Sequence, residues 1–361
     1  MSTPSEILNS PPEVLANIPL GSPPAGVQAL PPNPVSRGWL LITVSSILFF
    51  MATTCLIIHV YARTAIQRKV ARSDFILLAG FIMVIIFYIA SILMVTPPGT
   101  LGLHDWDYSL LDLTSKTNLV PFYINGIIIG PAFGLVKLSI FVMYLEIFAG
   151  LRWMRICVYI GATFSSAFYL ALTILHFYLM TPSRSETFAS RIFTPQYAMY
   201  IRIGVPTSAI SFGIDIYLFI LPLVAVSKLR IPKKKKILVM IGFGIGLLGC
   251  IGSLLSFIYR VINTRSHDRS WNGLAVVLVI HSKKFSEFGA VVAHWLCCTR
   301  CRKSNTVAKN SQDASNVSEP TPAEDKNLYP DLDFLTKPGD IERGDLEKRM
   351  ENRIGRDVIA V

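Results

Sequence analysis

Long apolar runs separated by short polar connectors dominate the middle of the chain. Seven runs can be recognised, at residues 39–60, 75–95, 120–145, 156–180, 203–226, 237–261 and 273–298. Each is close to the ~20 residues that a helix needs to cross the hydrocarbon core of a bilayer. The pattern therefore predicts an all-α, multi-pass integral membrane protein with a seven-transmembrane-helix bundle.

The seventh run is the weakest of the set. Four polar residues interrupt it: Ser282, Lys283, Lys284 and Glu287. Charged side chains are costly at membrane depth, so we treat these residues as interruptions of an otherwise apolar span.

The composition agrees with lipid as the solvent of much of the chain. Only 16% of the residues are charged and the mean hydropathy is +0.50, whereas a soluble domain carries roughly 25% charged residues. The net charge of +11 is concentrated in connectors beside apolar runs, which is typical of membrane topology and not of a nucleic-acid-binding surface. Membrane lipids are the predicted partners, and no nucleic acid is expected.

Lysine and arginine are unevenly divided between the two sets of connectors. Connectors 61–74, 149–155 and 226–236 hold twelve in 32 residues, whereas the opposite side holds six in 88. By the positive-inside rule, the N-terminus is outside or lumenal and the C-terminus is cytosolic. No cleavable signal pattern opens the chain, so the first span is expected to be its own signal-anchor.

The two ends of the chain differ from the membrane domain at 38–298. Residues 1–37 contain nine prolines and three charged residues, which predicts a Pro-rich, disordered outer tail. Residues 299–361 are polar with charges of mixed sign, which predicts a mostly disordered cytosolic tail. This tail and the basic connectors are the candidate contacts for a cytosolic partner.

Three cysteines lie at the predicted cytosolic edge of the last span. They are Cys297, Cys298 and Cys301, and basic residues such as Arg300 accompany them. Juxtamembrane cysteines in this setting are candidates for palmitoylation.

One ionisable residue lies within each of two apolar runs of the same direction, Lys137 in the third and Asp215 in the fifth. At 1.5 Å per residue, Asp215 lies about 18 Å into its span. Lys137 lies about 7 Å deeper in its own span. The long lysine side chain can close this difference in depth. We therefore predict an intramembrane polar pair, for which exchanging the two charges should rescue either single substitution. The alternative is that each residue separately faces water or backbone carbonyls.

The polar connector before the third span is the other candidate recognition element. It contains Gly102, His104, Trp106 and Asp107, and Arg260 lies near the outer end of the sixth span. These residues either line an outward-facing pocket or, for Arg260, reach lipid headgroups. No nucleotide loop, HExxH or GxSxG signature is present in the sequence, so no catalytic residue, metal site or cofactor is predicted.

The order of these motifs resembles the fungal rhodopsin-like seven-helix integral membrane proteins, the family that includes the satratoxin-cluster membrane proteins. The matching pieces are GLHDWD (Gly102–Asp107), KLSIFVMYLEIF (Lys137–Phe148), Asp215 with Leu221–Pro222, and a glycine-rich sixth span ending at Arg260. The last span departs from the family pattern, because Trp271 is far from Glu287 and HWLCCTR replaces a Cys-Leu-Pro ending. Lys283 and Lys284 do not follow an aspartate at the expected helical spacing, so a retinal chromophore is not predicted.

The resemblance implies a receptor-like, non-catalytic protein, in some members encoded beside secondary-metabolite (mycotoxin) genes. A small lipophilic ligand is then the expected partner at the outer connector and helix ends. A metabolite transporter or export accessory is one alternative, with Lys137 and Asp215 lining a polar path. A membrane enzyme acting on a lipophilic metabolite is another, with His104 and Asp107 as acid–base candidates.

Overall fold

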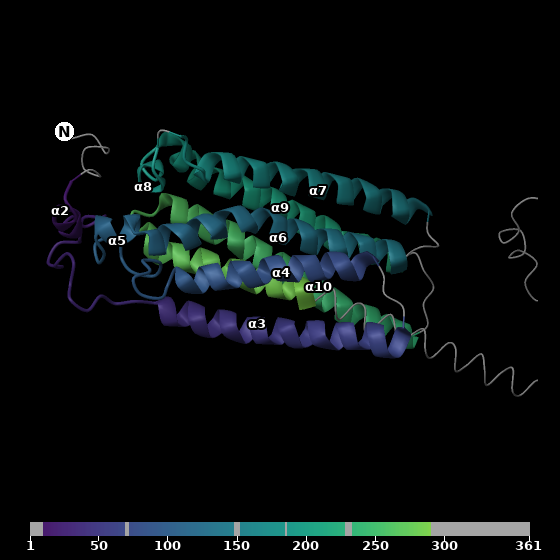
Figure 1. The fold of residues 1–361 in the computed structure, drawn as a ribbon. Helices are drawn as coiled ribbons and strands as arrows, with labels where there is room; N and C mark the ends of the chain where they lie inside the picture. The colour runs from purple at the N-terminus through teal and green to yellow at the C-terminus, as the bar shows by residue number, and fades with distance from the viewer. Residues whose placement is uncertain (1–9, 69–71, 148–151, 185, 228–232, 290–361) are drawn as a thin grey trace, which may run out of the picture. The chain divides into compact units, whose positions relative to one another are not determined.

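The computed structural model describes residues 10–68, 72–147, 152–184, 186–227 and 233–289 (Figure 1). All of these residues belong to one compact unit.

Six helices in the described part are long and apolar enough to cross a membrane. They are α3 (Gly38–Tyr61), α4 (Arg72–Leu93), α6 (Lys116–Ile147), α7 (Arg152–Met180), α9 (Pro195–Ser227) and α10 (Lys233–Arg265). The shorter helices are α2 (Pro12–Ala16), η1 (Ala62–Gln67), α5 (Leu110–Thr114) and α8 (Phe188–Arg191). Six of the predicted spans are therefore confirmed as helices. The largest difference is at α9, which starts at Pro195, where the missing N–H of proline costs little.

A further helix covers residues 269–289, where the described part of the chain ends. It is not among the six apolar helices, because its polar residues lower its hydropathy. It nevertheless packs inside the bundle. The ring of Phe285 lies 6.2 Å from Phe49 of α3, and that of Phe288 lies 5.1 Å from Phe81 of α4.

The helices pack in an order that places α6 in the interior. α6 lies against α4 and α7, and α9 lies against α7 and α10 (Figure 1). Fully buried rings, such as Phe87, Phe141 and Phe288, fill the space between them. Large apolar side chains on the outside, such as Phe50 at 73% and Phe164 at 60% exposure, give a surface suited to lipid tails. The chain is thus a multi-pass integral membrane protein in contact with lipid.

Gly161 allows α7 to approach its neighbours closely. A Cβ at this position would lie 2.4 Å from the ring of Tyr217 in α9 and 2.8 Å from that of Phe141 in α6. The Tyr217 hydroxyl donates to the carbonyl of Cys157 at 2.7 Å, so its ring cannot easily move away.

Gly161→Ala is expected to lower the free energy of unfolding by about 1–3 kcal/mol, measured by thermal unfolding in micelles. Gly213→Ala in α9, where a Cβ meets nothing within 4 Å, is the control, and equal losses from both would contradict this packing.

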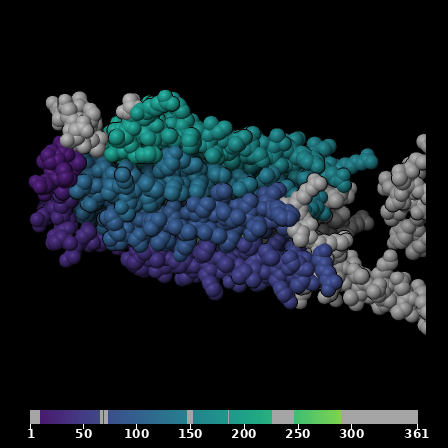
Figure 2. Space-filling view, in the orientation of Figure 1, coloured from purple at the N-terminus to yellow at the C-terminus, as the bar shows by residue number. Residues whose placement is uncertain are grey.

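The N-terminal segment from residue 10 covers the end of the bundle that carries connector 96–109, which we call the connector end. α2 packs on α5, and Leu15 is buried. Three of its backbone N–H groups donate to connector carbonyls: Gly21 to Asp105, Leu30 to Trp106, and Arg37 to Gly102, at 2.9–3.0 Å. Figure 2 shows this segment in purple over that end. The expected disordered tail is therefore an ordered cover from residue 10 to 37, because its backbone finds partners in the connector.

A polar cluster joins α3, α4 and α6 at the opposite end. Arg63 lies 3.1 Å from the Asp74 carboxylate and 3.4 Å from that of Glu146. His59 contacts Asp74 at 2.9 Å, and the Ser73 hydroxyl donates to Glu146 at 2.8 Å. These bonds join the helices near the basic connectors.

Candidate functional site

Four charged side chains meet in the interior, and we call Lys137, Asp215, Lys283 and Glu287 the charge cluster. Lys137 of α6 forms an ion pair with Asp215 of α9 and lies 3.5 Å from the Glu287 carboxylate. Lys283 lies 3.0 Å from Asp215 and 3.9 Å from Glu287. Each ammonium therefore contacts both carboxylates, and the charges alternate around the cluster.

Neighbouring hydroxyls complete the surroundings of the charge cluster. Ser253 of α10 donates to the Asp215 carboxylate. The Lys283 ammonium donates to Ser211 at 2.8 Å, and the hydroxyls of Ser211 and Tyr169 lie 2.8 Å apart. The cluster thus connects α6, α9, α10 and the 269–289 helix, with Tyr169 of α7 at its edge.

The charge cluster is withdrawn from solvent and balanced in charge. Lys137 is 0% exposed, and the other three side chains are 3–6% exposed. Taking a charge out of water costs several kcal/mol, which the opposite charges repay only if they stay close. Two ammonium groups and two carboxylates sum to zero, so the cluster is tolerable as a unit, whereas loss of any one member leaves a net buried charge.

Lys284 and His281 lie on a different face of the 269–289 helix from the charge cluster. The Lys284 ammonium lies 3.1 Å from the centre of the Phe87 ring and 4.9 Å from that of Phe133. Among the described residues it has no hydrogen-bond partner. The centre of the His281 ring lies 4.8 Å from that of Phe87, with the two rings tilted by 50°. This face therefore packs on aromatic rings of α4 and α6.

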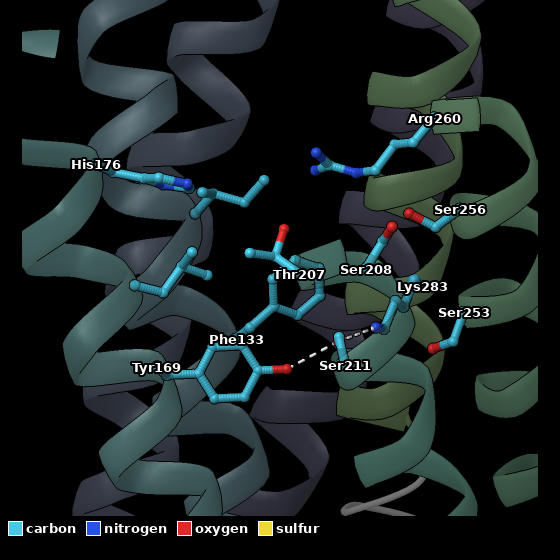
Figure 3. A pocket seen from close by; sticks show the side chains of 12 residues that line it. Phe133, Tyr169, His176, Thr207, Ser208, Ser211, Ser253, Ser256, Arg260 and Lys283 are labelled. Atoms are coloured by element: carbon cyan, nitrogen blue, oxygen red, sulfur yellow. Dashed lines mark hydrogen bonds between the residues drawn. The ribbon is translucent and has the colours of Figure 1, made fainter. Parts of the chain in front are cut away.

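A cavity of about 40 Å³ lies beside the charge cluster (Figure 3). Its wall includes Lys283, the hydroxyls of α9 and α10, and apolar side chains of α6 and α7. At ~10–15 Å³ for each water, it has room for about three or four water molecules. His176 of α7 and Arg260 of α10 point toward each other across it (Figure 3). The cavity is too small to enclose a large lipophilic molecule.

The connector forms a separate site at the connector end, in which the His104 ring lies between two tryptophan rings. Its ring stacks on Trp106 at 4.5 Å and on Trp271 at 3.8 Å, and its Nδ1 pairs with Asp268. Arg37 lies 4.0 Å over the Trp271 ring. These contacts fix the connector to the start of the 269–289 helix.

Asp105 caps that helix with its carboxylate. It accepts hydrogen bonds from the backbone N–H groups of Arg269 and Ser270, both at 3.0 Å, and from the Tyr108 hydroxyl at 3.2 Å. Burial, together with the Asp105 charge, raises the pKa of Tyr108, so this hydroxyl stays a donor. At Asp107, partial burial raises the pKa of the carboxyl, and the nearby His104 opposes this rise.

Gly102 is needed where the connector touches the helix. Its φ is +91°, a conformation that side chains rarely adopt, and a Cβ would lie 2.5 Å from the Leu274 side chain. Its N–H donates to the carbonyl of Ser270 at 3.3 Å. The described contacts of the motif GLHDWD therefore attach the connector to the start of the 269–289 helix.

The comparisons with known proteins agree with this architecture. The family model of the fungal rhodopsin domain matches residues 58–282. The chain belongs to the fungal rhodopsin domain family. Among curated relatives, the "SAT4 family membrane protein" of Emericella nidulans is 28% identical over 151 residues, which are 41% of this chain and 39% of the relative. "Fugralins biosynthesis cluster protein 2" of Gibberella zeae is 22% identical over 312 residues, 82% of this chain and 74% of the relative. No solved structure matches the chain.

The predicted site residues of this fungal rhodopsin domain fall into three groups. Lys137 and Asp215 are in contact, as members of a larger cluster. Gly102 and His104 contact the 269–289 helix, Trp106 stacks on His104, and the backbone of Asp107 bonds to that of His104. Arg260 lies in the cavity with His176 and shares no described contact with them. The possible palmitoylation sites (Cys297, Cys298 and Cys301), the end of the predicted seventh span and the 299–361 tail lie outside the described residues.

Sequence reasoning missed Lys283 and Glu287 as members of the cluster. It treated them as interruptions of a weak span, yet they are four residues apart and hence on one helical face. That spacing was the available signal. His176 gave no such signal, because a histidine in an apolar run is equally compatible with simple packing. Among the described residues, no group of three His, Cys, Asp or Glu side chains is arranged to hold a metal.

Proposed function

We propose that the chain is a non-catalytic, receptor-like membrane protein of seven helices that serves a fungal secondary-metabolite pathway. In this proposal the 269–289 helix is the seventh span, the connector end is outside or lumenal, and the basic connectors face the cytosol. The ligand is a small molecule that acts from the connector end.

The charge cluster carries the receptor-like part of the proposal. Lys137 and Lys283 each lie within reach of both carboxylates, so a small shift of one helix exchanges partners without leaving a charge unpaired. A packed element with two such arrangements is the kind of bistable unit on which ligand-driven switching depends. It joins four helices, so a shift on the cavity side is transmitted to the helix ends near the basic connectors.

The connector supports a non-catalytic role. His104 and Asp107 were the acid–base candidates of the enzyme alternative. The His104 ring is covered on both faces by tryptophans and paired with Asp268, which suits a fixed joint and leaves little room for a substrate.

The pathway part of the proposal rests on similarity. One relative is named as a protein of the fugralins biosynthesis cluster. A metabolite transporter is the second candidate, and it is favoured by the polar cavity that reaches Lys283 of the charge cluster.

A deletion strain of the source fungus discriminates these functions. We expect transcripts of a secondary-metabolite pathway to fall and its product to disappear from both cells and medium. The strain is compared with one that carries the wild-type gene at another locus. Product accumulation inside the cells, with normal transcripts, would favour export, and a trapped precursor would favour an enzyme.

A further inference from the structure

The cavity beside the charge cluster contains a positive charge that the described residues do not balance. Lys283 is already paired with two carboxylates. Arg260, by contrast, forms no ion pair with any residue in the described ranges, and its buried Nε has no hydrogen-bond partner there. Arg260 as a whole is only partly buried, but its cation on the wall, unpaired within those ranges, still gives the cavity a net affinity for an anion.

The guanidinium of Arg260 packs closely against the backbone of α9. Gly204 of α9 faces the guanidinium, and a Cβ on it would lie 2.8 Å from Nη1. Ser208 and Ser256 line the cavity on the same side as Arg260 (Figure 3), and the Ser208 hydroxyl donates to the carbonyl of Val205 at 2.7 Å. A guanidinium presents paired N–H donors that match the two oxygens of a carboxylate.

His176 supplies a second polar atom, Nε2, on the side of the cavity opposite Arg260 (Figure 3). Its Nδ1 lies 3.1 Å from the carbonyl oxygen of Gly126. Because a carbonyl only accepts, Nδ1 is the donor. Its Nε2 has no partner among the described residues, although the side chain is only 5% exposed. Nε2 and the guanidinium thus face the cavity from opposite sides, with the Tyr200 ring beside them, 5.0 Å from the His176 ring.

We propose that the cavity between α7, α9 and α10 binds the carboxylate of a small organic acid, with Arg260 as its counter-ion. The carboxylate replaces about two of the waters for which the cavity has room. A hydroxyl beside the carboxylate donates to Nε2 of His176, so hydroxy acids bind more tightly than the parent acid. This inference deepens the receptor-like proposal by naming a ligand class, and depends on that proposal only for its biological meaning.

The test uses the full chain, purified in lipid nanodiscs, with acetate and glycolate as probes. Sodium acetate at ten times its Kd should raise the melting temperature by about 3 °C over sodium chloride of equal ionic strength. Glycolate should reach the same shift at a lower concentration. Equal shifts from chloride and acetate, or no shift from either carboxylate, would overturn the proposal.

Two variants separate binding from folding. Arg260→Gln should abolish the acetate shift, while Arg202→Gln, an exposed arginine on α9, should keep it. Gly204→Ala displaces the flexible end of Arg260 without touching the backbone, and alanine favours a helix over glycine. It should therefore weaken acetate binding at least tenfold without lowering the melting temperature of the free protein.

An acetate shift that survives both Arg260→Gln and Gly204→Ala would also overturn the assignment. These measurements do not involve the pathway. If binding fails but the deletion strain loses pathway transcripts, the ligand class is wrong and the receptor-like function stands. If the reverse holds, the function fails and the site stands.

Discussion

Replacing Lys137 with methionine is expected to lower the free energy of unfolding by about 3–5 kcal/mol, the usual cost of removing one partner from a buried ion pair. The substitution leaves Lys283 alone against two carboxylates, so the charge cluster acquires a net negative charge. Methionine keeps the length of the side chain, so the loss comes from charge more than from packing. Thermal and denaturant unfolding of the purified protein in micelles measures it.

A second substitution should return much of that loss. Lys137→Met combined with Glu287→Gln leaves Lys283 and Asp215, which lie 3.0 Å apart, as a neutral pair. We expect the double variant to recover more than half of the stability lost by Lys137→Met. If the losses of the two single variants simply add, the cluster does not act as a unit.

Exchange of charges distinguishes the four-residue cluster from an isolated pair. The sequence alone suggests that Lys137→Asp with Asp215→Lys should rescue either single change. The structure revises this, because a lysine at position 215 would face Lys283 and an aspartate at 137 would face Glu287. The exchanged variant should remain destabilised, and full rescue would show that the pair is independent of the 269–289 helix.

The second large effect is expected at Asp105. Asp105→Ala should cost about 2–4 kcal/mol, because two backbone N–H groups and the Tyr108 hydroxyl lose a charged acceptor. The 269–289 helix should loosen at its start, which faster proteolysis between residues 262 and 275 would report. This change lies far from the charge cluster in sequence, so it tests the connector joint separately.

Asp107→Ala is the matched control for this variant. Asp107 is adjacent, but among the described residues its contacts are local: its backbone N–H donates to the carbonyl of His104 at 2.9 Å, and its carboxylate makes no hydrogen bond to the 269–289 helix. Its removal should change stability by about 0.5 kcal/mol or less. Equal losses from Asp105→Ala and Asp107→Ala would contradict the capping role of Asp105.

The bundle was largely predictable from the sequence, because lipid imposes a simple rule on helix length. Six apolar runs became six helices. The contact between Lys137 and Asp215 also followed from depth, since both lie in spans of the same direction. Depth, however, says nothing about which helices are neighbours.

Because depth does not show which helices are neighbours, sequence reasoning misplaced several residues. The charges at 283 and 287 lowered the hydropathy of their run, and hydropathy averages discard the i,i+4 spacing that turns both toward Lys137. Arg260 was grouped with the connector from its position near a helix end, but its side chain turns into the cavity toward His176. The N-terminal segment looked disordered because its order depends on backbone bonds to the connector, which composition does not encode.

The most direct test of the receptor-like proposal is complementation of the deletion strain with the double variant Lys137→Met/Glu287→Gln. This variant keeps one neutral pair, so it should be stable and reach the membrane at wild-type levels, yet it cannot exchange partners within the cluster. Quantification of pathway transcripts should then give the level of the deletion strain. Restoration to the wild-type level would contradict the proposal, because it would show that the charge cluster serves stability alone.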